Sequence, residues 1–128
     1  MTYYFNKEIN NSFDQTIGKV TELLKEEGFG ILTEIDVTAT LKKKLDADFR
    51  NYRILGACNP PFAYKALQSE DKIGTLLPCN IIVQEKGDNR IEVAAVNPMF
   101  SMKGIENMEL EKIAGEVADK LKRVIDAL

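Results

Sequence analysis

The two Cys-Asn steps are the residues of this chain that are best suited to chemistry. Cys58-Asn59 stands at the end of one expected strand, and Cys79-Asn80 stands at the start of the next. If these strands are antiparallel neighbours, both thiols lie at one rim of the sheet. Cross-strand Cβ atoms there are about 4.5 to 5.5 Å apart, which is close to disulfide spacing. Because the asparagine amides could donate to a thiolate or a bound oxyanion, we expect a ligand site at Cys58, Asn59, Cys79 and Asn80.

The same cysteines also fit a packing role. Cys58 continues the strand face of Ile54, and Cys79 continues that of Ile81, so both could be small buried hydrophobes. A functional thiol site would instead carry redox exchange, sulfur or acyl transfer, or soft-metal binding, with Cys58 or Cys79 as the candidate catalytic nucleophile. Two thiols alone leave a structural zinc site incomplete, so we expect neither a metal nor a cofactor.

Two carboxylates and an arginine form a second group of candidates. Glu34 and Asp36 are two residues apart on an expected strand and share a face, as a paired-carboxylate or hard-cation site requires. Asp36 can equally cap a helix that begins near Thr38, and Glu34 can pair with Arg53 on a neighbouring strand. Arg53 could alternatively clamp an anion. We keep Glu34 and Arg53 as candidate ligand-binding residues.

Composition and charge exclude several classes of function. The 128 residues include 17 basic and 20 acidic side chains, a net charge of −3, and no histidine. Without histidine there is no Ser-His-Asp triad, no histidine base and no histidine-ligated metal or haem. The acidic balance offers no field that would attract nucleic acid. The longest apolar run, residues 93–96, is far shorter than the ~20 residues that span a bilayer, and the N-terminus has no secretory-signal pattern. We expect one cytoplasmic domain over residues 1–128, with reduced cysteines and no membrane partner.

The positions of the apolar residues predict the elements that hold these candidates. Alternation predicts strands, and stripes at three- and four-residue steps predict helices. The expected strands are at about 3–9, 31–37, 52–58, 76–85 and 90–96, and the expected helices are at about 12–27, 38–45, 61–71 and 109–128. Residues 87–89 are expected to form a hairpin turn, and the apolar segment 99–105 is expected to be a loop that covers another part of the molecule.

This order of elements predicts a two-layer α+β fold. A mostly antiparallel five-stranded sheet would carry the two long helices on one face, with short helices inserted between strands. The second face of the sheet is expected to be apolar as well. Leu32, Leu55, Ile82 and Val96 are the residues expected there. Short helices or a second subunit could cover this face.

Three segments resemble the signatures of the uncharacterised family called domain of unknown function 302. They are residues 28–36, 52–60 and 76–80, and the resemblance extends over nearly the whole chain. It implies a fold similar to single-copy TATA-binding-protein-like domains, β-α-β4-α with added short helices, usually assembled as a homodimer. The resemblance implies no reaction, and similarity of fold is no reason to expect DNA binding.

The function expected from these observations is binding of a small ligand by a homodimer, in a pocket near the two Cys-Asn steps. The chain offers apolar sheet surface and a polar rim, but no complete set of nucleophile, base and oxyanion donors. One alternative is a thiol-based redox enzyme or a sulfur or acyl carrier that uses Cys58 or Cys79. Another is a scaffold that acts only through its dimer surface, with Met99 and Phe100 at the seam.

Overall fold

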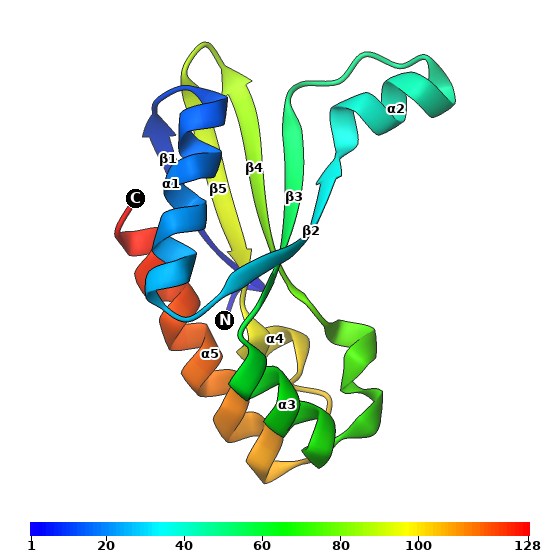
Figure 1. Cartoon of the computed structure of the whole chain (residues 1–128), viewed down its shortest axis with the longest axis vertical. Helices are drawn as coiled ribbons and strands as arrows, with labels where there is room; N and C mark the ends of the chain where they lie inside the picture. Colours follow the sequence, from blue (N-terminus) through cyan, green and yellow to red (C-terminus); the bar gives the residue numbers. More distant parts are fainter.

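The computed structural model describes every residue from Met1 to Leu128 and contains one five-stranded sheet (Figure 1). The elements are β1 (Tyr4–Asn10), α1 (Phe13–Glu26), β2 (Gly30–Asp36), α2 (Val37–Leu45), β3 (Tyr52–Cys58), α3 (Pro60–Ser69), the 3₁₀ helix η1 (Asp71–Leu76), β4 (Cys79–Gly87), β5 (Arg90–Val96), α4 (Pro98–Ser101) and α5 (Met108–Asp126). The strands lie in the order β1-β5-β4-β3-β2, and every neighbouring pair is antiparallel. The expected α+β class is therefore confirmed.

The hydrophobic core lies between the sheet and the two long helices, α1 and α5, which cover the same face (Figure 1). The sheet contributes Leu55, Ile81, Val83, Ile91 and Val93, and the helices contribute Val20, Leu24, Leu110, Leu121 and Val124, all 1% exposed or less. Each such side chain contributes about 1.5 to 3 kcal/mol when it leaves water. The central strands therefore pack against α1 and α5 in the most deeply buried part of the molecule. None of the helices combines the length and apolar character needed to cross a membrane.

The structure differs from the expected elements in two places. The expected strand from residue 76 begins only at Cys79, because residues 71–76 form η1 and Pro78 has no N–H to donate to a strand partner. The expected loop after Val96 begins with α4. Pro98 suits the first position of that helix, and the Asn97 side chain accepts a hydrogen bond from the N–H of Met99 at 3.1 Å.

Leu55 was expected on the wrong face of the sheet. It is aligned with Ile81 on β4, is 0% exposed, and lies under the helices. Because Ile54 and Leu55 are both apolar, their strand shows no alternation that would assign either residue to a face. Ile82 and Val96 do lie on the second face, as expected.

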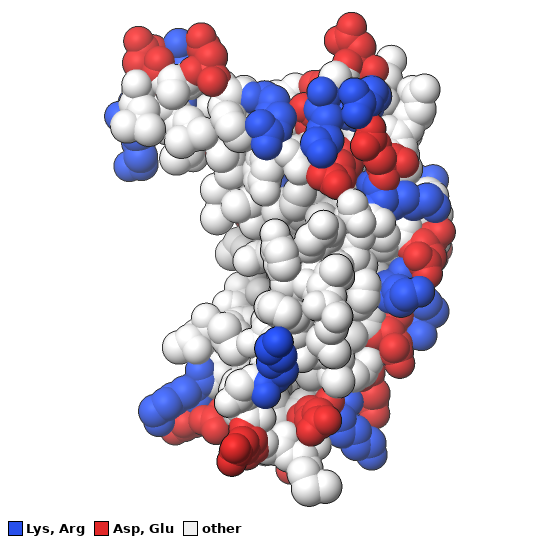
Figure 2. All heavy atoms as spheres, turned by 180° about the vertical axis from the view of Figure 1, so that it is seen from behind, with Lys and Arg blue, Asp and Glu red and all other residues white.

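The second face of the sheet is not covered by α1 or α5. It carries a hollow of about 510 Å³ whose floor includes Ile82, Ala94 and Val96. Figure 2 shows this side of the molecule as a concave surface whose middle is free of charged side chains. Helix α2 projects beyond the sheet at one end of this surface and has no buried residue (Figure 1).

Candidate functional site

A cavity of about 300 Å³ lies at the end of the sheet where β3 ends and β4 begins. We call it the apolar pocket, because 14 of its 17 lining residues are hydrophobic. Its walls are Phe62, Ala63, Ala66 and Leu67 of α3, Ile113, Ala114 and Val117 of α5, the strand-end residues Ala57, Cys58, Asn59 and Cys79, and Phe29, Leu32, Leu77, Pro78, Pro98 and Met102. The cavity is thus built from segments that are far apart in the sequence.

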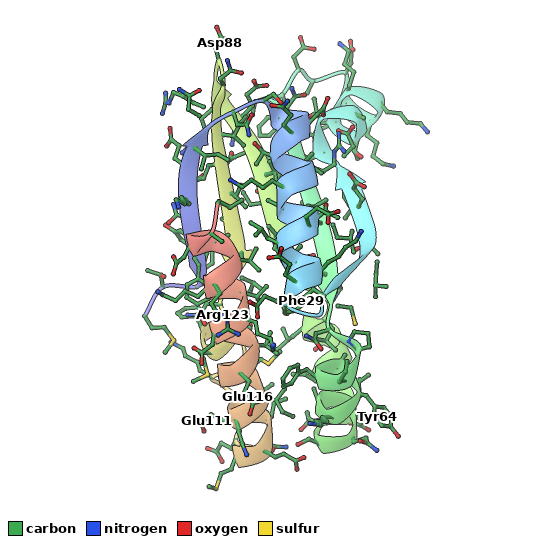
Figure 3. All side chains as sticks on the ribbon, turned by 60° about the vertical axis from the view of Figure 1, so that its left-hand side comes forward. Phe29, Tyr64, Asp88, Glu111, Glu116 and Arg123 are labelled. Carbon is green, nitrogen blue, oxygen red and sulfur yellow. The ribbon has the colours of Figure 1, made fainter.

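The pocket exists because α3 packs beside the part of α5 that extends past the sheet (Figure 3). Pro60 and Pro61 stand at the first positions of α3, where the missing N–H groups have no helical partner in any case. The helix therefore starts immediately after β3. Alanines of α3 and α5 face the space between these two helices. Because their side chains are small, the space stays open, whereas larger side chains would fill the cavity. Ala66 and Ala114 are the buried examples, at 4% and 2% exposure.

Asn59 is the main polar side chain of the pocket wall. It is 8% exposed, and its Nδ2 donates a hydrogen bond to the backbone oxygen of Glu27 at 3.1 Å. This bond orients the amide. No protein group donates to its Oδ1, so an acceptor is available to a donor on a ligand. No charged side chain lines the pocket.

The two cysteines both line the pocket, but they do not face each other across the strands. Cys79 is aligned with Ala57 and not with Cys58. Successive residues of a strand point to opposite faces, so the two thiols leave β3 and β4 on different sides. Both are free cysteines. The prediction that these two strands are antiparallel neighbours is confirmed. The prediction that Cys58 and Cys79 lie directly opposite each other is wrong, because the register differs by one residue.

The Cys79 thiol is poorly suited to act as a nucleophile at neutral pH. Burial raises the pKa of Cys79 to about 11, and the nearby Cys58 adds to the increase. Because the thiolate is the reactive form, this thiol stays protonated and unreactive near pH 7. In the pocket it acts as a small neutral wall group.

We expect the raised pKa of Cys79 to reduce stability in alkali. The unfolded thiol ionises above its ordinary pKa of 9.0, whereas the folded thiol ionises near 11. Between these values the unfolded state holds fewer protons, so the free energy of unfolding falls as pH rises, by about 2 to 3 kcal/mol in all. Urea unfolding of the wild type and of Cys79→Ala at several pH values between about 8 and 11 measures this loss.

In the Cys79→Ala variant, the part of the fall in unfolding free energy that comes from Cys79 should be absent. Cys58→Ala serves as the matched control. Since burial is the larger cause of the shift, Cys58→Ala should keep most of the loss. An equal alkaline loss in the wild type and in Cys79→Ala would show that Cys79 is not the titrating group.

The remaining sequence candidates lie outside the pocket. The guanidinium of Arg53 binds Glu34 at 2.6 Å and lies 3.7 Å from Asp36, while its carbon Cζ is 5.6 Å from the ring centre of Phe13. Asp36 also caps α2, accepting from the N–H of Ala39 at 3.0 Å. These residues form an ion-pair group that ties β2, β3 and α1 together. The Arg53 Nε is buried without a hydrogen-bond partner.

Asn80 lies on the other side of the sheet from Cys79. It lines the hollow on the second face. The structure therefore brings Cys58, Asn59 and Cys79 together and separates Asn80, Arg53 and Glu34 from them. No three cysteine or carboxylate side chains lie close enough together to hold a metal ion.

Sequence reasoning missed most of the pocket wall. Phe62 lines the pocket, whereas the nearby Tyr64 on the same helix is 66% exposed and points away from it (Figure 3). Met102 belongs to the apolar segment that was expected to cover another part of the molecule, and it lines the pocket. The apolar stripe of α5 predicted a core helix. It did not show that Ile113 would meet α3 beyond the sheet.

The fold and the cavity define a class: a single α+β domain with an apolar pocket between its sheet end and two helices. The model of the family described as domain of unknown function DUF302 matches residues 5–128, so the chain belongs to this family. A crystal structure of an uncharacterised conserved DUF302 protein from Bacillus stearothermophilus is similar, with a TM-score of 0.90 and 27% identity over 98% of each chain. No curated protein matches the chain.

Proposed function

We propose that this protein binds a small, largely apolar molecule in the apolar pocket. The observation that carries the proposal is a cavity of about 300 Å³ with a hydrophobic lining and one available amide acceptor. Ligand sites are typically concave and mostly apolar, with few polar groups that orient the ligand. Because no charged side chain lines the wall, the buried part of the ligand is uncharged.

The volume of the pocket sets the size of the ligand. An apolar cavity of about 150 Å³ accepts benzene. A cavity twice as large fits about twelve non-hydrogen atoms, which corresponds to two fused rings or a chain of about ten carbons. A hydroxyl or amide N–H on this ligand could donate to Asn59 Oδ1.

A series of linear primary alcohols tests this function. The alcohols compete for the full-length protein with the fluorescent probe 1-aminonaphthalene, whose two fused rings match the volume of the pocket. Each buried methylene contributes about 0.8 kcal/mol, so affinity should rise roughly fourfold per carbon and stop rising near ten carbons. Failure of both the probe and the alcohols to bind would overturn the proposal, and so would an affinity independent of chain length.

We propose in addition that the protein forms a homodimer through the second face of its sheet. The middle of this face is apolar and uncharged (Figure 2). In a twofold interface the same patch meets itself, and an uncharged patch can do so without repulsion. The hollow is also lined by Gln84, Lys86 and Glu92, whose charges offset each other. Glu92 accepts hydrogen bonds from Asn6 at 2.9 Å and Gln84 at 2.7 Å and forms an ion pair with Lys86 at 3.6 Å. An apolar centre with a polar rim is typical of interfaces.

The Ile82→Glu variant is expected to be a monomer. Ile82 lies in the apolar centre of the second face, and the substitution would place two carboxylates inside the interface. Light scattering coupled to size-exclusion chromatography should give twice the chain mass for the wild type and a single chain mass for the variant. Gln15→Glu, on the exposed side of α1, adds the same charge and should leave the dimer intact. A monomeric wild type, or a dimeric Ile82→Glu variant, would contradict this interface.

A further inference from the structure

The edge of the apolar pocket at Phe62 carries two ammonium groups from different helices. Phe62 lines the pocket, and its ring centre lies 5.7 Å from the Nζ of Lys65 and 5.9 Å from the Nζ of Lys120. Lys65 belongs to α3 and Lys120 to α5. The same ring therefore forms part of the uncharged wall and lies beneath two ammonium groups that do not themselves line the pocket.

These charges are only partly neutralised by the protein. Lys65 forms no ion pair, and the carboxylate beside Lys120 is that of Glu27, at 3.6 Å. Glu27 is held more closely by Arg123, at 2.9 Å, so one carboxylate is shared by two cations. Glu116 lies one turn before Lys120 on α5 but makes no ion pair with it (Figure 3). The carboxylate of Asp119 also acts on Arg123, so Lys65, Lys120 and Arg123 together exceed Glu27 and Asp119 by one positive charge.

We infer that the ligand of the apolar pocket is a single-chain amphiphile with an anionic head group, whose chain fills the pocket and whose head lies beside Lys65 and Lys120. This inference rests on the proposed binding function and adds the chemical class of the ligand. The uncharged wall excludes the charge from the interior, and the two ammonium groups attract it at the Phe62 edge. A carboxylate on a chain of about ten carbons meets both requirements.

Three ligands with the same ten-carbon chain separate the effect of the head group from that of the chain. Decanoate, decan-1-ol and decylammonium are each used to displace 1-aminonaphthalene, at concentrations below micelle formation. Exposed ion pairs change affinity by a factor of about 1.4 to 5 each, so decanoate should bind roughly fivefold more tightly than the alcohol. Decylammonium should bind most weakly. Added salt should reduce the preference for decanoate and leave the affinity for the alcohol unchanged.

The double variant Lys65→Gln with Lys120→Gln locates the head group. It should bind decanoate no more tightly than decan-1-ol while keeping wild-type affinity for the alcohol. Lys19→Gln with Lys112→Gln is the matched control, because it removes the same charge from α1 and from another part of α5. This variant should keep the preference for decanoate.

Equal binding of decanoate and decan-1-ol by the wild type would overturn the inference and leave the proposed function supported. A preference for decanoate that survives the double variant at Lys65 and Lys120 would overturn it in the same way. If neither the probe nor any of the three ligands binds, the proposed function fails, and the inference fails with it.

Discussion

Ala66→Phe is expected to abolish ligand binding without unfolding the protein. Ala66 is 4% exposed and lines the apolar pocket from α3. A phenyl ring needs about the 150 Å³ that accepts benzene, which is half of the available volume. At about 0.8 kcal/mol per excluded methylene, losing half of a ten-carbon chain weakens binding by roughly 1,000-fold. Displacement titration with decan-1-ol measures this loss.

The stability of Ala66→Phe separates pocket filling from general damage. A larger side chain in a well-packed core costs about 1 to 3 kcal/mol, but here an existing cavity receives the ring. The free energy of unfolding in urea should therefore change by less than this. Ala118→Phe is the matched control, because Ala118 is 5% exposed on α5 and does not line the pocket. The free energy of unfolding of Ala118→Phe should fall by the full range of about 1 to 3 kcal/mol expected for an overpacked core. Wild-type affinity for decan-1-ol in Ala66→Phe would show that the ligand binds elsewhere.

Gly56→Ala is expected to lower the free energy of unfolding by about 2 to 3 kcal/mol, near the upper end of the range for overpacked sites. Gly56 lies on β3 between two neighbouring strands and is aligned with Thr33 and Asn80. A Cβ there would overlap the side-chain oxygen of Thr33 and would lie only 2.8 Å from the Cγ of Pro78. Since Pro78 immediately precedes β4, relief of the overlap would move the strand start that carries Cys79.

Gly30→Ala is the control for Gly56→Ala. Gly30 lies on β2, is exposed, and has no atom within 4 Å of the position that a Cβ would take. Its replacement should change stability by no more than about 0.5 kcal/mol, as for most surface substitutions. Urea unfolding of both variants gives the comparison. Equal stability of Gly56→Ala and the wild type would show that the close approach of β2, β3 and Pro78 is not required.

Local sequence patterns were sufficient for most elements of this fold, but not for η1 and α4. The stripe of α5 and the alternation of β5 depend only on nearby residues, and both elements lie within two residues of their expected bounds. The hairpin turn at residues 87–89 was also expected from local chemistry, and Asn89 there adopts a positive φ of 57°. The capping role of Asp36 follows from its position before a helix in the same way.

The walls of the pocket depend on contacts that no local pattern contains. The meeting of α3 with α5 brings Ala66 and Ala114 together across nearly fifty residues of sequence. The separation of Asn80 from Cys79 is different, because adjacent strand residues point to opposite faces. That rule could have been applied to the sequence, so the prediction that Cys79 and Asn80 share one site was avoidably wrong. The position of Cys79 opposite Ala57 required the register of the two strands.

Methyl-group NMR of the full-length protein, titrated with decan-1-ol, tests most directly whether the apolar pocket binds a ligand. Met102, Ile113 and Val117 line the pocket, while Ile82 and Val96 lie in the hollow on the second face. Saturable shifts confined to the methyl groups of Met102, Ile113 and Val117 are the expected result. Shifts confined to Ile82 and Val96, or no saturable shifts at all, would contradict a binding function for the apolar pocket.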